Sequence, residues 1–402
     1  MQKPIALPCS LPMIEERPVA DIVDAYLAEA RTRRASDIHF DPIDTHIRIR
    51  FRIDGILSDA PPLPRSIAHE VIARIKILAG LRTDEHHVAH DGRFRAYCSG
   101  TPLDVRVSIT PTYYGESAVL RLLSGDGSNR DLSILGFSAS DQSLIDSALK
   151  KSHGMILTTG PTGSGKTTTL YALLRQLHTN DVSIVTIEDP IEYAIAGIRQ
   201  IPVNERSGLT FASGLRSLVR QDPDVIMVGE IRDRETADLA VNTALTGHLV
   251  LSTIHTTDAA TTLIRLLDMR IEPYLIASTV TIAIAQRLVR RICEMCKEET
   301  PLSDAERESL MHMLIPQSDA LPFFRGRGCE NCGGSGYRGR IGICETLLVD
   351  DIMRELVLKK ASARVLRASA IKKGMTPLLA DGLCKAHAGH TTLSEIFSIG
   401  QE

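Results

Sequence analysis

A glycine-rich segment near the middle of the chain constrains its fold more than any other feature. Residues 160–167 have the sequence GPTGSGKT, which follows the apolar run 155–157 and precedes a pattern typical of a helix at 168–174. A strand, a phosphate loop and a helix in this order bind nucleoside triphosphates, because glycines let backbone N–H groups converge on the phosphates at a helix N-terminus. The sequence therefore predicts a nucleotide-binding α/β domain.

The residues of this phosphate loop have separate expected roles. Lys166 is placed to reach the β- and γ-phosphates, and the Thr167 hydroxyl is placed to hold Mg²⁺. ATP and Mg²⁺ are therefore the expected cofactors. The predicted nucleotide-binding residues are Gly160, Pro161, Thr162, Gly163, Ser164, Gly165, Lys166, Thr167 and Thr168.

The composition is that of a globular protein with two or three domains. Of 402 residues, 43% are hydrophobic, and a formal net charge of −3 gives no general attraction for nucleic acid or anionic membranes. The first residues do not resemble a signal peptide, and the longest apolar-rich segment, 275–285, is too short to span a bilayer. Eight cysteines, four of them in C-x-x-C pairs, suit a reducing compartment. We expect a cytoplasmic protein.

The N-terminal third predicts a small α+β domain at residues 19–123, after a leader at 1–18. The expected elements are helices at 19–33 and 67–78 and strands at 35–40, 46–53, 102–109 and 117–123. The segment 46–53 alternates between apolar and polar residues, which predicts a strand with one buried and one wet face. Residues 125–129 are all turn formers, within a predicted linker at 124–135.

Two groups of arginines lie on these predicted strands. Arg48, Arg50 and Arg52 are on the wet face, where a charge needs no special explanation. Arg106 and Arg121 each interrupt an apolar strand, which indicates a partner surface rather than open solvent. One candidate partner is a γ-phosphate on a neighbouring domain or subunit, since an arginine finger accelerates hydrolysis roughly 10³- to 10⁵-fold. The other is an internal ion pair.

After the phosphate loop, short apolar runs alternate with helical patterns, as a mostly parallel sheet covered by helices requires. Three of the expected strands end in Glu188, Glu230 and His255, at the edge where open α/β sheets bind ligands. We expect Glu188 to act on Mg²⁺ or water, Glu230 to orient and deprotonate the attacking water, and His255 to hydrogen-bond the γ-phosphate. Asp224 and His248 lie at the opposite strand ends, where turn, capping or structural roles are expected.

Four cysteines form two C-x-x-C pairs, Cys293 with Cys296 and Cys329 with Cys332, separated by residues 297–328. Four thiolates suit tetrahedral Zn²⁺ with no open coordination position, which predicts a structural metal site. Paired redox thiols are the alternative.

The remaining boundaries follow from these features. The expected domains are an ATPase domain at 136–292, a tetracysteine zinc subdomain at 293–342 and an α-helical C-terminal end at 343–402. Within the last of these, 351–360, 363–373 and 378–388 have helical spacing.

Four motifs together resemble those of the bacterial type II/IV secretion ATPases. The phosphate loop, 187–192 (IEDPIE), 226–233 (IMVGEIRD) and the segment from Gly247-His248 to His255-Thr256 resemble the Walker A motif, Asp box, Walker B motif and His box. The cysteine pairs and the segments 381–383 and 389–392 resemble the GspE/PilB group, which serves type II secretion and type IV pilus assembly. The resemblance runs from about residue 19 to residue 399.

That resemblance implies a ring-shaped homohexamer of RecA-like ATPase domains, each preceded by a PAS-like sheet domain. It implies that ATP lies between the two domains and that hydrolysis rotates one against the other. Arg106 and Arg121 match arginines that contact the phosphates, Glu230 matches the catalytic glutamate, and His248 and His255 match the His-box histidines. The motion would pass to a polytopic inner-membrane platform protein that drives pilin or pseudopilin assembly. Membrane attachment would be through partners alone, with no sequence-specific nucleic acid bound.

Some features depart from the family pattern. Ser117 stands where an arginine is usual, and 86–90 (HHVAH) replaces a more basic stretch. Little room precedes residue 19 for the extra domain that docks many members to membrane partners.

Three alternative functions remain open. Relatives that act as pilus-retraction ATPases generally lack the cysteine pairs. A nucleic-acid translocase is disfavoured by an aromatic content of 4% and the absence of tryptophan. A nucleotide-gated scaffold that barely hydrolyses ATP is disfavoured by the intact Lys166, Thr167 and Glu230.

Overall fold

The computed structural model describes residues 18–98, 101–123, 131–312 and 322–400. The chain divides into two compact units, Met1–Ser128 (unit 1) and Asn129–Glu402 (unit 2). Most of the predicted leader, together with residues 125–129 of the predicted linker, lies outside the described residues. No helix in the described ranges is long and apolar enough to cross a membrane.

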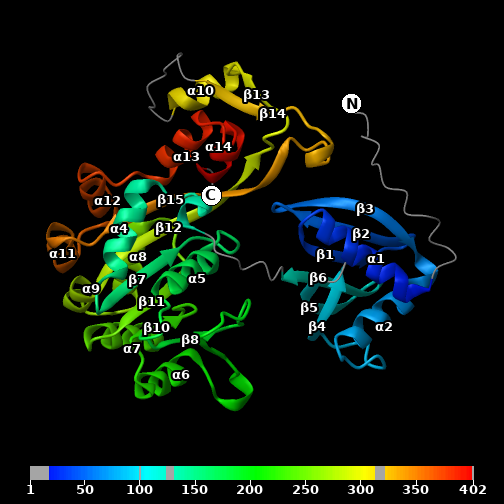
Figure 1. Ribbon diagram of the computed structural model, residues 1–402, viewed down its shortest axis with the longest axis horizontal. Coiled ribbons are helices and arrows are strands. Elements are labelled where there is room, and N and C mark those ends of the chain that lie inside the picture. The colour runs from blue at the N-terminus through cyan, green and yellow to red at the C-terminus, as the bar shows by residue number, and fades with distance from the viewer. Residues whose placement is uncertain (1–17, 99–100, 124–130, 313–321, 401–402) are drawn as a thin grey trace. The chain divides into compact units, whose positions relative to one another are not determined.

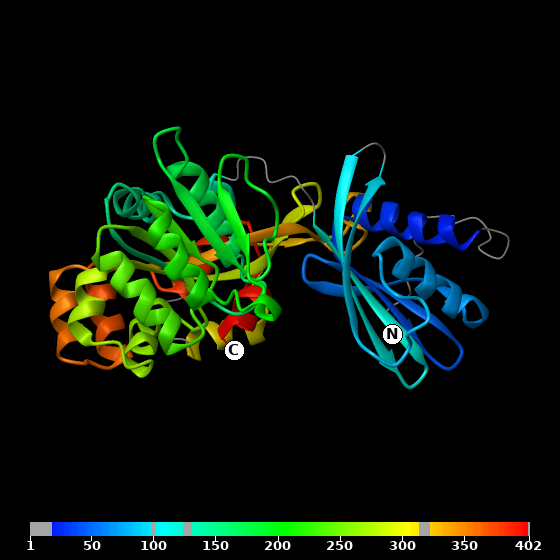
Figure 2. The same cartoon turned by 90° about the horizontal axis from the view of Figure 1, so that it is seen from below.

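Unit 1 is an antiparallel six-stranded sheet with its two longer helices on one face (Figures 1 and 2). Its elements are α1 (Val19–Thr32), β1 (Ala35–Pro42), β2 (His46–Ile53), β3 (Ile56–Pro64), α2 (Ala68–Leu78), β4 (His90–Cys98), β5 (Thr101–Thr112) and β6 (Gly115–Leu123). The strand order is β3-β2-β1-β6-β5-β4. Ile47, Ile49 and Phe51 of β2 are buried in one core with Tyr26 and Leu27 of α1, as the alternation in 46–53 predicts.

The two strands that sequence patterns missed, β3 and β4, form the two edges of this sheet. Pro61, Pro62 and Pro64 make β3 unlike a strand, but an edge strand tolerates proline because one side of its backbone needs no partner. In β4, Arg93 and Arg95 alternate with half-buried residues at the opposite edge. Charged edge strands are expected where a sheet must not extend further.

Unit 2 contains a seven-stranded sheet of order β15-β12-β7-β11-β10-β8-β9, in which β15 alone is antiparallel to its neighbour. The strands are β7 (Gly154–Thr159), β8 (Ile184–Glu188), β9 (Arg199–Pro202), β10 (Val225–Val228), β11 (Leu249–Ile254), β12 (Val280–Ile292) and β15 (Tyr337–Leu348). The first helices are α3 (Leu132–Leu135), α4 (Ala139–Leu149), α5 (Lys166–Leu177), α6 (Phe211–Leu218), α7 (Arg234–Leu245), α8 (Ala259–Asp268) and α9 (Pro273–Thr279).

Helices cover both faces of this sheet (Figure 1). Along β7, Met155 and Leu157 belong to one core and Ile156 to the other, because successive side chains of a strand point to opposite faces. A parallel sheet buried on both faces explains why β7, β10 and β11 are continuous apolar runs in the sequence. The α/β fold with an N-terminal α+β unit is therefore confirmed.

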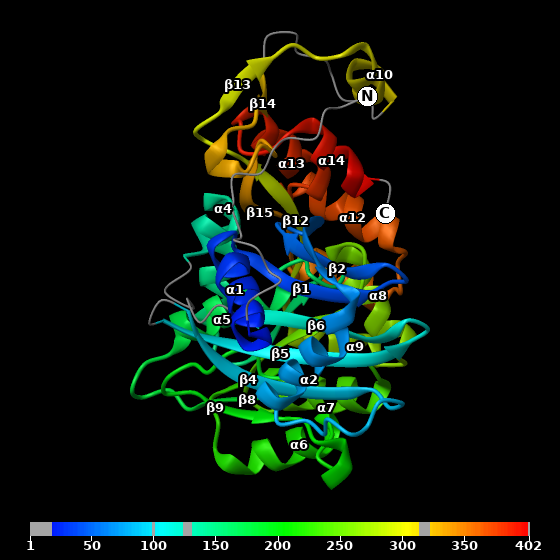
Figure 3. The same cartoon turned by 90° about the vertical axis from the view of Figure 1, so that its right-hand side faces the viewer.

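The end of the chain packs against the β12–β15 side of the sheet. A small antiparallel pair, β13 (Lys297–Thr300) and β14 (Phe323–Gly326), lies near α10 (Asp304–His312), α13 (Leu378–His387) and α14 (Leu393–Gly400), as Figures 1 and 3 show. Helices α11 (Asp351–Leu358) and α12 (Ala363–Lys372) complete the C-terminal end. Strand β15 runs through the boundary expected at 342/343. The domain limits stay predictions.

Candidate functional site

The phosphate loop connects the buried strand β7 to helix α5, as the sequence predicts. Gly160 has φ of 144°, and a Cβ atom there would lie 2.4 Å from the carbonyl oxygen of Gln286. Gly165 has φ of 94° and precedes the first residue of α5. Both positions need glycine, because the backbone adopts conformations that side chains rarely allow and passes close to β12.

Two polar groups in this loop fit an anionic ligand. Lys166 is buried, and its Nζ donates to the carbonyl oxygens of Gly160 (2.8 Å) and Pro161 (2.9 Å). In the described part of the chain, the buried Ser164 hydroxyl has no hydrogen-bond partner. A loop with an unsatisfied hydroxyl and an ammonium at the N-terminus of a helix has the donor set that phosphates require.

Glu230 and His255 lie side by side beyond the ends of β10 and β11. The Glu230 Oε2 atom is 3.3 Å from His255 Nε2, and Glu230 Oε1 accepts from Arg232 at 2.6 Å. Thr253 of β11 fixes the backbone on both sides of Glu230, accepting from the Ile231 N–H (2.9 Å) and donating to the Gly229 carbonyl (2.9 Å). The parallel register therefore brings together two side chains that the sequence predicts separately.

The charged residues around Glu230 and Lys166 influence the pKa values of these two side chains. Burial alone would raise the pKa of Glu230, but the hydrogen bond and charge of Arg232, together with His255, hold that pKa below its ordinary value. Burial lowers the pKa of Lys166 to about 8; the charge of Glu230 opposes this shift and that of Arg287 adds to it. Glu230 thus lies within electrostatic reach of Lys166 and is an ionised carboxylate at neutral pH. An ionised carboxylate can accept a proton.

Glu188 ends β8 but faces the interior, with 2% of its surface exposed. Its carboxylate accepts hydrogen bonds from the hydroxyls of Tyr171 and Thr186 and from the Gln200 side chain. These partners hold the Glu188 carboxylate in the interior, among α5, β8 and β9. Its assignment to Mg²⁺ or water stays a prediction.

The residues at the opposite strand ends have structural contacts. His248 Nδ1 lies 3.1 Å from the carbonyl oxygen of Thr243, at the end of α7. Asp224 accepts a hydrogen bond from the Ser183 N–H at 2.7 Å. Neither contact involves the phosphate loop.

In unit 1, Arg106 and Arg121 are cross-strand neighbours on β5 and β6. The Arg121 side chain is 59% exposed and pairs with Asp37 of β1, with Nε 3.0 Å from Oδ1. Arg106 is half-buried. An internal ion pair is therefore present at Arg121, and a phosphate contact by either arginine stays a prediction.

The wet-face arginines of β2 also have acidic partners. Arg48 pairs with Asp59 (2.8 Å), Arg50 with Asp41 (2.7 Å) and Arg52 with Asp37 (3.7 Å). These ion pairs link neighbouring strands across the exposed side of the sheet.

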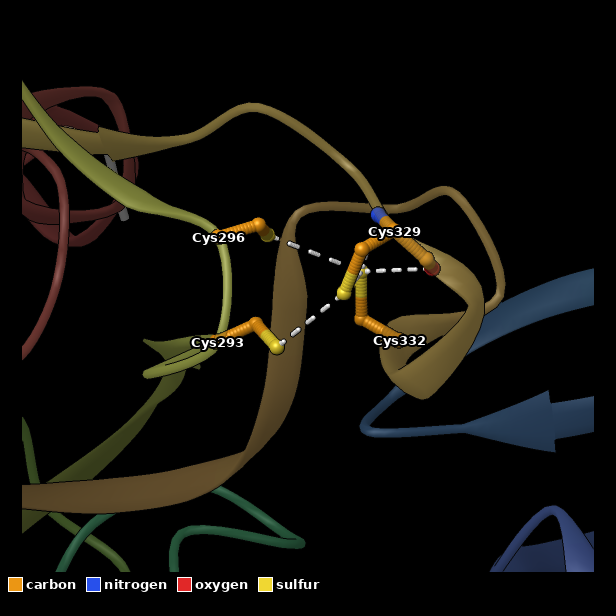
Figure 4. A group of neighbouring side chains, drawn as sticks. All are labelled: Cys293, Cys296, Cys329 and Cys332. Atoms are coloured by element: carbon orange, nitrogen blue, oxygen red, sulfur yellow. Dashed lines mark hydrogen bonds between the residues drawn. The ribbon is translucent and has the colours of Figure 1, made fainter.

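The four paired cysteines meet as a single cluster, with all sulfur atoms within 4.8 Å of one another (Figure 4). Cys293 and Cys329 sulfurs are 3.9 Å apart, as are those of Cys296 and Cys332. Four thiolates at about 2.3 Å from a tetrahedral Zn²⁺ would lie about 3.8 Å from one another. The cluster therefore has the dimensions of a zinc site and not of two disulfides.

Backbone N–H groups favour the ionised form of Cys332, whereas burial raises the pKa of Cys296 to about 12. Burial opposes ionisation of Cys332, but hydrogen bonds from the N–H groups of Cys329 (3.2 Å) and Gly336 (3.2 Å) more than offset it and lower the pKa to about 7. The Gly328 N–H also points at Cys296, 3.3 Å from its sulfur. Such donors are the outer contacts that stabilise metal-bound thiolates.

Fold and site together define a P-loop ATPase with a RecA-like sheet. The chain belongs to the family described as Type II/IV secretion system protein, whose model matches residues 13–398. It is an ATP hydrolase of the secretion and pilus motor class.

Named relatives cover most of the chain. It is 43% identical to the type IV pilus assembly ATPase PilB of Myxococcus xanthus over 95% of this chain and 68% of that protein. It is 43% identical to the type II secretion system ATPase E of Vibrio cholerae, over 96% of this chain and 76% of that protein.

Among solved structures, the pilus retraction motor PilT with bound ADP has a TM-score of 0.65 and 25% identity, covering 96% of this chain and 98% of that one. The ATPase DotB of Legionella pneumophila has a TM-score of 0.72 at 22% identity, over 97% of this chain and 98% of that one, and supports the fold alone.

Proposed function

We propose that this chain is a cytoplasmic, homohexameric motor that couples ATP hydrolysis to assembly of a type IV pilus or a type II secretion pseudopilus. The observation that carries the proposal is the pairing of Glu230 with His255, together with the action of the Glu230 charge on Lys166 of the phosphate loop. High identity to a pilus assembly ATPase and a type II secretion ATPase supports the assembly direction. The polytopic inner-membrane platform protein implied by the family resemblance is the proposed partner.

In this proposal each side chain has one task. Lys166 and the backbone N–H groups of residues 160–168, apart from Pro161, bind the phosphates, and Thr167 contributes a ligand to Mg²⁺. Glu230 orients the attacking water and takes its proton, because its carboxylate is ionised and held by Arg232. His255 hydrogen-bonds the γ-phosphate and is therefore sensitive to its loss.

Further groups support these tasks from outside the loop. Arg106 and Arg121 stabilise negative charge that develops on the transferred phosphoryl group. Glu188 positions the water or Mg²⁺ ligands through the polar network around Tyr171. The four cysteines hold a structural Zn²⁺ that fixes the segment between β12 and β15.

Two variants test the ATPase assignment. Lys166→Ala is expected to lose ATP binding, because the loop loses its cation. Glu230→Gln is expected to keep binding and lose hydrolysis by about 10²-fold or more, because the amide cannot accept the proton. Glu235→Gln is the matched control, because Glu235 lies in the first turn of α7 and pairs with the exposed Arg216. Calorimetry measures nucleotide binding, and a phosphate-release assay measures hydrolysis. Wild-type turnover in Glu230→Gln would contradict the assignment.

The partner is tested with the same trapped protein. Glu230→Gln loaded with ATP is used as bait on native membranes, with Lys166→Ala as the control that cannot load. Capture of a polytopic membrane protein by the loaded bait alone supports the motor. Stimulation of ATPase activity by single-stranded DNA, with no such capture, would favour a translocase instead.

A retraction motor is the second candidate, supported by the structural likeness to PilT. The identity of 25% to PilT against 43% to the assembly and secretion ATPases makes retraction the weaker proposal.

A further inference from the structure

Strand β12 continues past the carboxyl end of β7 and lies beside the phosphate loop. The two strands are parallel, with Ala285 opposite Thr159, so the next two residues of β12 flank the start of the loop. The first is Gln286, whose Oε1 accepts from Thr169 of α5 at 2.7 Å. The second is Arg287, buried with 9% of its surface exposed.

Arg287 joins its own strand, β12, to the segment that follows His255, and it lies beside the phosphate loop. Its guanidinium donates through NH1 to the carbonyl oxygen of Gln286 (3.1 Å) and through NH2 to that of Thr257 (2.8 Å). A Cβ atom at Gly160 would lie 3.2 Å from NH1, so the guanidinium passes directly against the base of the phosphate loop. Thr257 is two residues beyond His255.

Thr159, at the end of β7, also contacts the segment that carries His255. The Thr159 hydroxyl accepts from the Thr256 N–H at 2.9 Å and lies 2.6 Å from the Thr256 hydroxyl. The segment that carries His255 is thus held by Thr159 at the end of β7 and by Arg287 on β12. The planar guanidinium reaches a carbonyl of its own strand and a carbonyl of the His255 segment through two nitrogens held in a fixed geometry.

We propose that Arg287 is a positioning residue of the ATPase: it ties the loop that carries His255 to the phosphate loop, so that the γ-phosphate contact and the Glu230 pairing stay aligned. This inference rests on the proposed function, in which the phosphate loop holds ATP. A displacement of about 1 Å in an active site costs roughly 10²-fold in rate. Loss of the tie should therefore lower turnover more than binding.

The test compares Arg287→Gln and Arg287→Lys with wild type, and uses Arg291→Gln as a control on the same strand. The Arg291 side chain is 42% exposed and pairs with Glu294. For both Arg287 variants we expect kcat to fall about 10- to 100-fold, with ADP affinity near pH 7 changed by less than about 3-fold. Arg291→Gln should match wild type in every measurement.

Two results would overturn the inference. Wild-type kcat in Arg287→Lys would show that the two-carbonyl contact is dispensable. An equal loss of ADP affinity and kcat in both variants would indicate damage to the phosphate loop itself. Normal hydrolysis in Lys166→Ala would instead overturn the proposed function, so the two failures are distinguishable.

Discussion

Arg121 forms an ion pair with an acidic neighbour. Asp37 is nearly buried, with 7% of its side chain exposed, and lies against Arg121 and Arg52. If Arg121 stabilises the transferred phosphoryl group, Arg121→Ala should lower kcat by about 10³-fold. Arg95→Ala is the matched control, because Arg95 is equally exposed at 59% and pairs with Asp104 on the adjacent strand. Phosphate-release assays on both variants check this, and equal activities would contradict the role.

At the scale of residues, the sequence identifies candidate site residues that lie at the ends of strands. Glu230 and His255 are predicted because each follows an apolar run, and parallel strands place their carboxyl ends together. Arg232 and Arg287 could not be assigned in this way. The position of Arg287 depends on the pairing of β12 with β7, more than 100 residues earlier in the chain. An arginine within an apolar strand is the only signal that the sequence offers for it.

Strand β15 contributes a buried carboxylate that joins two helices to the sheet. Glu345 has none of its surface exposed and accepts from the first N–H groups of α8 (Ala259, 3.1 Å) and α13 (Leu378, 3.3 Å). Glu345→Ala would leave two buried N–H groups without an acceptor, each costing about 1–3 kcal/mol. We therefore expect a loss of about 2–6 kcal/mol in the free energy of unfolding. Glu355→Ala, which removes an exposed pair with Lys359, should change it little.

Chemical denaturation at several pH values measures both effects. Burial raises the pKa of Glu345, so its stabilising contribution is complete below the unfolded pKa of about 4.3 and decreases as the pH rises through the folded pKa. The difference between wild type and Glu345→Ala should therefore be largest in acid. A difference that grows toward alkaline pH would contradict this account.

In the proposed function, the four-cysteine cluster needs a bound Zn²⁺ to keep its geometry. Three pairs of these sulfurs lie 3.8–3.9 Å apart, so thiolates at these positions would repel one another without a cation between them. We expect a strong chelator to release zinc with a cooperative loss of structure between β12 and β15, measured by elemental analysis and hydrogen exchange. Cys344→Ser is the matched control, since Cys344 lies outside the cluster on β15. Native protein without zinc and with four titratable thiols would exclude the site.

At the scale of elements, the sequence predicts the central strands that are buried on both faces of the sheet but not the edge strands. The central strands β7, β10 and β11 and helices α11, α12 and α13 follow patterns that local sequence specifies. The edge strands β3 and β4 do not, because their prolines and charges suit one solvent-facing side. Helix α14 also went unpredicted; its Ile396 and Leu393 are buried by contacts with the rest of unit 2.

At the scale of the whole molecule, the proposed ring makes subunits depend on one another. Glu230→Gln should bind ATP and hold it, so a ring that hydrolyses ATP in turn would stop at each trapped subunit. When Glu230→Gln is mixed with wild type and allowed to exchange subunits, we expect activity to fall faster than the wild-type fraction. Lys166→Ala in the same mixtures is the comparison, because it enters rings without trapping ATP. Phosphate release across a series of ratios measures this. A strictly proportional decline would mean that the subunits hydrolyse ATP independently, which would contradict hydrolysis in turn around the proposed ring.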